Sequence, residues 1–331
     1  MTENKTAHNK LSVKEKRTLR MKTLTKEERN YIRRRELCDK LWVIFRAVIL
    51  CGLGFIIFYP LIYMISCTFR ERADMSDPTV VWVPRRPTLS VLKETIEAMD
   101  FWNTLKNTVL LNVGCSLVQV LSCAVTGYGF ARFSFKGKKL LFGIVILMIL
   151  VPTQIISVPL YFQFRFFLGT DVNLIDTMWT MYLPAMTANG IRSGLMILIF
   201  RQFFRGLPRE LEDAAYIDGC GPFMTFVRVM IPNAMSSFLT VFLFSIVWYW
   251  NDYYISSMYF NETKTIATTL CNIDNELKLR LFGDGNAKMN RREQTAWRQA
   301  GCLVSIAPLL IMYTFLQKYF TEGIERSGLV T

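Results

Sequence analysis

Residues 107–131 read NTVLLNVGCSLVQVLSCAVTGYGFA, a stretch without a charged side chain. A helix of this length can cross the hydrocarbon core of a bilayer, which takes roughly 20 residues. Its polar residues recur every three or four positions and therefore share one helical face. They are Asn112, Ser116, Gln119, Ser122 or Cys123, and Thr126. Such a face lies against protein or water, so we expect helix–helix contact, helped by the small residues Gly127 and Gly129, or, as the alternative, contact with a solute.

Five further apolar runs have a similar length. They cover about 43–67, 140–163, 178–200, 236–258 and 302–320. The 331 residues are 52% hydrophobic, and the mean hydropathy is +0.26. The sequence therefore predicts an all-α integral membrane protein with six transmembrane helices. The expected divisions are a basic tail over 1–42, the first helix and an extracytoplasmic loop over 43–102, a transmembrane core over 103–320 with a cytosolic loop over 201–235, and a tail over 321–331.

The formal net charge is +13, which by itself could indicate a nucleic-acid-binding protein. The Lys and Arg residues, however, lie between apolar runs, where they act as a topology signal. Six spans place both termini on one side of the membrane. The segments 132–139 and 201–235 on that side carry Lys and Arg besides the basic tail, so the positive-inside rule predicts cytoplasmic termini and no nucleic-acid partner.

Side chains that perform chemistry are scarce. Eight cysteines form no CxxC pair, and the only histidine, His8, lies in the polar tail. These features predict no metal site and no His-based catalysis. A phosphate-binding GxxxxGK[ST] sequence is also missing, the nearest match being Gly137-Lys138-Lys139. We therefore expect a non-catalytic chain that binds no cofactor.

The loop between the fourth and fifth runs predicts two short helices. The first lies within Leu207 to Pro222: Pro208 suits a first helical position, three acids suit the positive end of the helix dipole, and Gly219 suits the stop. A second helix, Phe223 to Met230, is expected to end at Pro232. The pair would form either a knob that a partner grips or a plain interfacial helix.

The spacing within this loop is specific. Asp213-Ala214-Ala215, then Gly219, then Val229-Met230-Ile231-Pro232 resembles the EAA loop of ABC importer permeases, whose pattern is Glu-Ala-Ala, Gly and Ile-x-Leu-Pro at these offsets. Asp213 stands where that family has Glu. The wider resemblance runs from about residue 40 to 320 and is to sugar-importer permeases similar to the second maltose permease subunit. Stretches that carry it include Phe58-Tyr59-Pro60, Trp82-Val83-Pro84, Gly127-Tyr128-Gly129-Phe130-Ala131-Arg132-Phe133, Trp250-Asn251-Asp252 and Gln317-Lys318-Tyr319-Phe320.

The resemblance implies a type I ABC importer permease in the plasma membrane of a bacterium, forming half of the pore for a sugar or oligosaccharide. It implies as partners a second homologous permease, a dimer of cytosolic ATPase subunits that hold ATP and Mg, an extracytoplasmic binding protein, the sugar and membrane lipid. It leaves open which of the two permeases holds the sugar. The residues expected to couple to the ATPase are Glu210, Glu212, Asp213, Ala214, Ala215, Asp218, Gly219 and Pro232.

The fourth run is broken at Asn189-Gly190, and unwound backbone survives in a membrane only beside protein or a cavity. We expect substrate contact there and, more weakly, on the fifth run. The candidates are Thr187, Asn189, Gly190, Arg192, Trp248 and Asn251. Arg192 is too deep for easy snorkelling and should be paired or face the pore. A helix break that merely packs is the alternative.

Other functions that the sequence leaves open are an ABC importer permease for a non-sugar solute and a secondary transporter. For the latter, Asp252 is the one acidic residue within the runs. An intramembrane enzyme would need paired carboxylates or histidines that the runs lack.

Overall fold

The computed structural model describes residues 25–77, 79–80, 82–283 and 288–328, and all regular structure in these ranges is helical. The first 24 residues of the predicted tail and the last three residues of the chain lie outside this part. The chain divides into two compact units, Met1–Tyr63 and Met64–Thr331. The fold class predicted from the sequence, an all-α membrane protein, is confirmed.

Helix α3 spans Lys26–Thr68 and provides the described part of the first unit. Its start is capped by Thr25 and Glu28: the Thr25 N–H donates to Glu28 Oε2 at 2.9 Å, and the Glu28 N–H donates to Thr25 Oγ1 at 3.4 Å. The helix therefore begins at Lys26, within the predicted basic tail over 1–42. From Leu37 to Thr68 the helix is strongly apolar, and no residue of its most apolar 18-residue stretch is buried. Apolar side chains on all faces suit a lipid environment.

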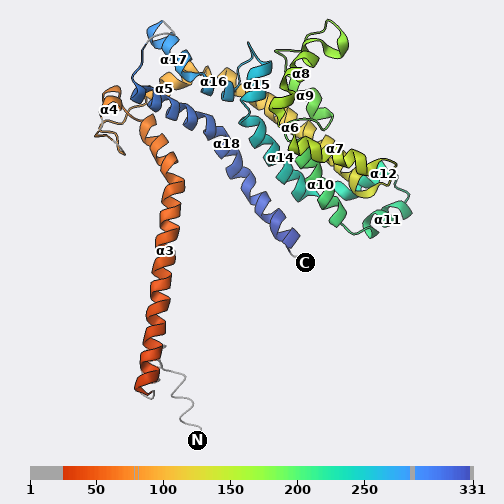
Figure 1. Cartoon of the computed structure of the whole chain (residues 1–331), viewed down its shortest axis with the longest axis horizontal. Helices are drawn as coiled ribbons and strands as arrows, with labels where there is room; N and C mark the ends of the chain where they lie inside the picture. The colour runs from red at the N-terminus through yellow and green to blue at the C-terminus, as the bar shows by residue number, and fades with distance from the viewer. Residues whose placement is uncertain (1–24, 78, 81, 284–287, 329–331) are drawn as a thin grey trace. The chain divides into compact units, whose positions relative to one another are not determined.

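Helix α6 (Phe101–Arg132) is the centre of the second unit. It packs along α10 (Ser193–Gly206), α14 (Met235–Trp250) and α9 (Trp179–Met186) (Figure 1). Gly127 permits the close approach of α10, because a Cβ at this position would lie 2.6 Å from the Cβ of Phe200. Gly129 has no neighbour within 4 Å of such an atom. Of the two predicted small contact residues, only Gly127 lies in the helix contact.

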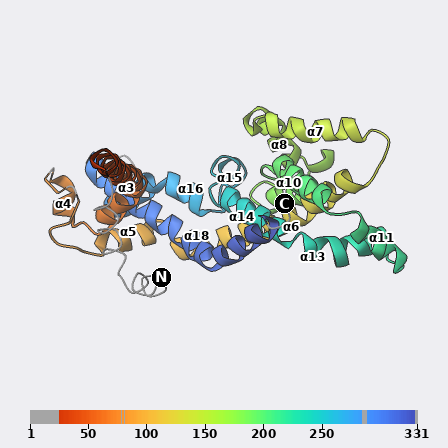
Figure 2. The ribbon, with the colours of Figure 1, turned by 90° about the horizontal axis from the view of Figure 1, so that it is seen from below.

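The predicted loops on the other side of the spans contain helices of their own. These are α4 (Arg72–Ser76), α5 (Ser90–Ala98), α16 (Ile266–Cys271) and α17 (Ile273–Phe282), while α15 (Tyr254–Tyr259) covers the end of the predicted fifth run. The long helix α18 (Arg291–Gly328) packs on α5, α16 and α17 and then reaches α14 (Figure 2). Its buried Trp297 donates from Nε1 to Glu94 Oε2 at 3.1 Å.

Three of the predicted spans are not continuous helices. The third consists of α7 (Lys138–Leu150) and α8 (Thr153–Arg165), and the chain bends by 104° between them, at Val151-Pro152. The fourth consists of α9 and α10, separated by residues 187–192. The fifth ends at Trp250, because the Asp252 carboxylate accepts from the N–H groups of Ile255 (3.4 Å) and Ser256 (2.8 Å) and so caps the separate helix α15.

By length and composition, three helices in the described ranges could cross a membrane: α3, α6 and α18. The number rises to five if each bent pair, α7 with α8 and residues 222–233 with α14, counts as one span. The count of six spans stays a prediction from the sequence.

Candidate coupling knob and translocation path

Helix α11 (Glu210–Ile217) forms the first short helix of the loop between α10 and α14, as the sequence predicts. Its three acids occupy the first turn. It ends at a glycine in the left-handed region: Gly219 has φ +81°, and the Cys220 N–H returns to the Ala215 carbonyl at 2.9 Å. This is the Schellman type of helix end, which favours glycine at this position. The predicted stop at Gly219 is confirmed.

The second short helix is longer than predicted. It runs through α12 (Pro222–Thr225), a π-helical turn labelled η2 (Phe226–Met230) and α13 (Ile231–Asn233), and then bends by 80° onto α14. Pro232 does not end it, because this residue sits in the first turn of α13, where the missing N–H costs little. We call residues 208–223, which comprise α11 and its two flanks, the α11 knob.

The knob presents a mixed surface. Exposed on it are Glu210, Asp213, Ala214, Asp218 and Gly219. The most exposed apolar side chains are Ile217 at 86% and Phe223 at 74%. Sequence reasoning missed both as functional candidates, although Glu210, Asp213, Ala214 and Ile217 follow the helical repeat of one face. The opposite face, with Glu212 and Ala215, is buried.

Glu212 pairs within its own chain. Its Oε2 lies 3.1 Å from Arg132 Nε, at the end of α6, and its Oε1 accepts from the Tyr128 hydroxyl at 2.7 Å. The sequence predicts that this carboxylate faces an ATPase, but the side chain is only 9% exposed. Ala215 is also buried, at 5%. A larger side chain at Ala215 would therefore disturb the packing of the chain itself.

The polar stripe of α6 binds the broken backbone between α9 and α10. Gln119 donates from Nε2 to the Ile191 carbonyl at 2.7 Å, and Ser122 donates to the Ala185 carbonyl at 2.6 Å. Tyr249 of α14 donates to Gln119 Oε1 at 2.5 Å. A Cβ on Gly190 would lie 2.4 Å from the Tyr249 hydroxyl oxygen, so the glycine makes this contact possible. These contacts support helix–helix packing as the role of the stripe.

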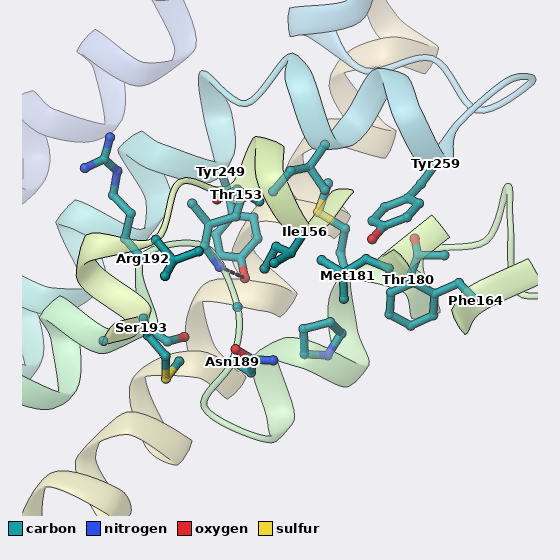
Figure 3. A pocket seen from close by; sticks show the side chains of 18 residues that line it. Thr153, Ile156, Phe164, Thr180, Met181, Asn189, Arg192, Ser193, Tyr249 and Tyr259 are labelled. Carbon is teal, nitrogen blue, oxygen red and sulfur yellow. Dashed lines mark hydrogen bonds between the residues drawn. The ribbon is translucent and has the colours of Figure 1, made fainter. Parts of the chain in front are cut away.

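A cavity of about 140 Å³ lies against this break. Figure 3 shows its lining from α8, α9, the break and α14, with Thr153, Met181, Asn189 and Tyr249 among the labelled side chains. Ser193 also lines it; its hydroxyl is buried and has no hydrogen-bond partner among the described residues. Most of the other lining residues are apolar.

Arg192 and Trp248, predicted path residues from two different runs, meet in the structure. The guanidinium carbon of Arg192 lies 5.3 Å from the centroid of the Trp248 ring, and Phe244 stacks on Trp248 at 5.6 Å. The guanidinium points away from Asn189 and Tyr249 (Figure 3). Thr187, Asn189 and Asn251 are exposed. Asn189, Gly190 and Arg192 line the cavity, and the guanidinium of Arg192 extends from it to the exposed face around Trp248.

The profile of the family described as "Binding-protein-dependent transport system inner membrane component" matches residues 124–326. The chain belongs to this family and is a multi-pass permease subunit of the bacterial plasma membrane.

Known transport proteins are similar to this chain over most of its length. An arabinooligosaccharides transport system permease protein of Halalkalibacterium halodurans is 27% identical and covers 83% of this chain and 92% of its own length. A polygalacturonan/rhamnogalacturonan transport system permease protein of Bacillus subtilis is 23% identical over 80% of this chain and 89% of its own. A chain of a bacterial ABC transporter involved in alginate import has the same fold, with a TM-score of 0.70, 21% identity and coverage of 86% and 98%.

Proposed function

We propose that this chain forms one half of the translocation pore of an ATP-driven importer for an oligosaccharide. The proposal rests on its family and on the arabinooligosaccharide and polygalacturonan transporters among its relatives. A second permease would complete the pore, and an extracytoplasmic binding protein would deliver the sugar. ATP and Mg would be held by two ATPase subunits, since the chain has no phosphate-binding loop.

In the structure itself, the exposed α11 knob is the observation that supports docking of an ATPase. A helix whose outer face combines Ile217, at 86% exposure, with the carboxylates of Glu210 and Asp213 suits insertion into a cleft with basic margins. Phe223 would extend the apolar contact. Apolar side chains at the centre of an interface contribute most of the binding energy, and charges at the rim contribute little. This docking requires the knob, and with it both termini, to be cytoplasmic.

We expect Ile217→Glu to lose most of the bound ATPase, because it places a charge where an apolar side chain should be buried. The expected loss of affinity is about 2 kcal/mol or more. Asp213→Ala should cost about 0–1 kcal/mol, as exposed ion pairs do. The measurement is co-purification of the ATPase with each permease variant from membranes, with Ile217→Leu as the matched control. Equal recovery with Ile217→Glu and Ile217→Leu would refute docking at this knob.

For the path, we propose the exposed face around Arg192 and Trp248, next to the cavity at the helix break. A guanidinium at membrane depth is unfavourable against lipid, and no described residue forms an ion pair with it, which supports an aqueous or substrate-facing position. The indole and the guanidinium together offer an apolar face and several hydrogen-bond donors. That combination suits a sugar, whose rings present C–H faces and hydroxyl groups.

A further inference from the structure

The buried group at the base of the α11 knob links this helix to the central helix of the bundle. Besides its ion pair with Glu212, Arg132 donates from Nη2 to the Leu207 carbonyl at 2.7 Å, which fixes the chain entering the knob. Tyr128, one turn before Arg132, holds the other carboxylate oxygen of Glu212. Two side chains of α6 therefore hold both the start of the knob and α11.

This link lies in an apolar environment. The side chains of Arg132 and Glu212 are 7% and 9% exposed. The Tyr128 ring packs against Phe226 of η2 at 4.9 Å and Phe204 of α10 at 5.5 Å. A buried charge that loses its partner is costly, so the three groups should move together or not at all. Surface ion pairs such as Arg72 with Glu94 impose no such constraint.

The α6 side chains that contact the α9–α10 break lie about two and a half turns before Tyr128 and Arg132. Gln119 and Ser122 hold the backbone on the two sides of the α9–α10 break, and Gln119 also binds Tyr249 of α14. A rigid helix thus joins the knob to the segment that lines the cavity. Displacement of α11 would be transmitted along α6 to residues 185–191.

We infer that Arg132, Glu212 and Tyr128 are positioning residues that transmit movement of the docked ATPase from α11 to α6. This inference rests on the proposed function. It assigns Glu212 a role inside the permease, distinct from that of its neighbour Asp213, which is exposed on the docking face. Loss of the link should separate ATP hydrolysis from transport without releasing the ATPase.

The test uses the whole transporter, purified with its partner permease and ATPase and reconstituted in proteoliposomes with binding protein and oligosaccharide. Glu212→Gln and Arg132→Gln should retain the ATPase and hydrolyse ATP, while transport per ATP falls on the order of ten-fold. The exchange variant, Arg132→Glu with Glu212→Arg, should recover part of the loss. Asp213→Asn should show the opposite pattern, with weaker ATPase retention and unchanged transport per ATP in the complexes that remain.

Two results would overturn the inference. One is loss of the ATPase in Glu212→Gln, which would place Glu212 in the docking contact. The other is unchanged transport per ATP in both single variants. If the variants do not assemble, spin labels on the exposed residues Val125 of α6 and Tyr216 of α11 in an otherwise intact permease give a second measurement. Their separation should be the same with and without ATP, and a separation that changes would refute a rigid link. Failure of the unaltered transporter to use ATP would instead refute the proposed function.

Discussion

At Arg192 the backbone adopts φ +54°, in the left-handed region, just before α10 begins. Such a conformation is unfavourable for a residue with a side chain, and it is retained where the surroundings require it. Here the turn allows Gln119 to reach the Ile191 carbonyl while the guanidinium extends over Trp248. The residue thus combines a structural turn with an exposed cation, as a path residue would.

We therefore expect Arg192→Gln to raise the KM for uptake on the order of ten-fold, which corresponds to the loss of one favourable contact of about 1.4 kcal/mol. Asn189→Ala, at the cavity, should have a smaller effect in the same direction. Uptake kinetics of the reconstituted transporter measure both, with Arg165→Ala, an exposed arginine at the end of α8, as control. Unchanged kinetics and substrate preference in Arg192→Gln and Asn189→Ala would reduce the break to a packing feature.

Asp176 links the segment before α9 to the segment between α15 and α16. Its carboxylate accepts from the backbone N–H groups of Asn261, Glu262 and Thr263 at 3.2, 2.9 and 3.1 Å. Burial favours the neutral acid, but the three N–H groups outweigh it, and the pKa of Asp176 is lowered below its ordinary value. Because the folded state holds the ionised form more tightly, this carboxylate stabilises the fold above its ordinary pKa, and the stabilisation is lost as the pH falls through the lowered value.

Asp176→Asn should accordingly lower the free energy of unfolding at neutral pH by about 1–2 kcal/mol, within the range for hydrogen bonds to a charged group at a partly exposed site. The difference between the variant and the unaltered chain should shrink on acidification below about pH 4, near the ordinary pKa of Asp. Thermal unfolding in detergent across this pH range measures it, with the exposed Asp171→Asn as control. A difference that does not change with pH would exclude the ionised carboxylate as the cause.

At the scale of the helices, the contact between α6 and α10 allows the clearest prediction. Gly127→Ala places a methyl group 2.6 Å from Phe200 Cβ and 3.0 Å from the Arg201 nitrogen, so the helices must separate. The expected destabilisation is about 1–3 kcal/mol. Gly129→Ala, two residues along the same helix, has free space and should be neutral or slightly stabilising. Equal melting temperatures for the two variants would contradict the observed packing.

The sequence predicted elements well where a repeat of 3.6 residues governs them. The polar stripe of α6 follows that repeat, and Gly219 as the stop of α11 follows from its conformational freedom. Pro152 predicts an interruption of the third run, but the 104° change of direction there was not predicted, because apolar residues continue through the bend and composition does not reveal direction. The pairing of Glu212 with Arg132 was also missed, since it joins positions 80 residues apart (212 − 132) whose contact depends on how α6 and α11 pack.

At the scale of the whole molecule, some helices bury their apolar side chains in the bundle and others leave them exposed. Helix α3 and the bent pair α7 and α8 expose many large apolar side chains, including Ile57 at 68%, Leu140 at 73% and Ile155 at 71%. Apolar surface on this scale requires lipid or another subunit. The chain's one acidic residue within the predicted runs, Asp252, has a structural role, because it caps α15 and accepts hydrogen bonds from Ser256.

The proposed function is therefore tested most directly by measuring which energy source drives uptake. The permease, its partner permease and the ATPase are reconstituted in proteoliposomes with ATP inside and with binding protein and labelled oligosaccharide outside. We predict uptake that requires both internal ATP and the binding protein, and that continues when an ionophore collapses the ion gradients. Uptake that persists without ATP and stops when the gradients are collapsed would contradict the account and would identify the chain as a secondary transporter.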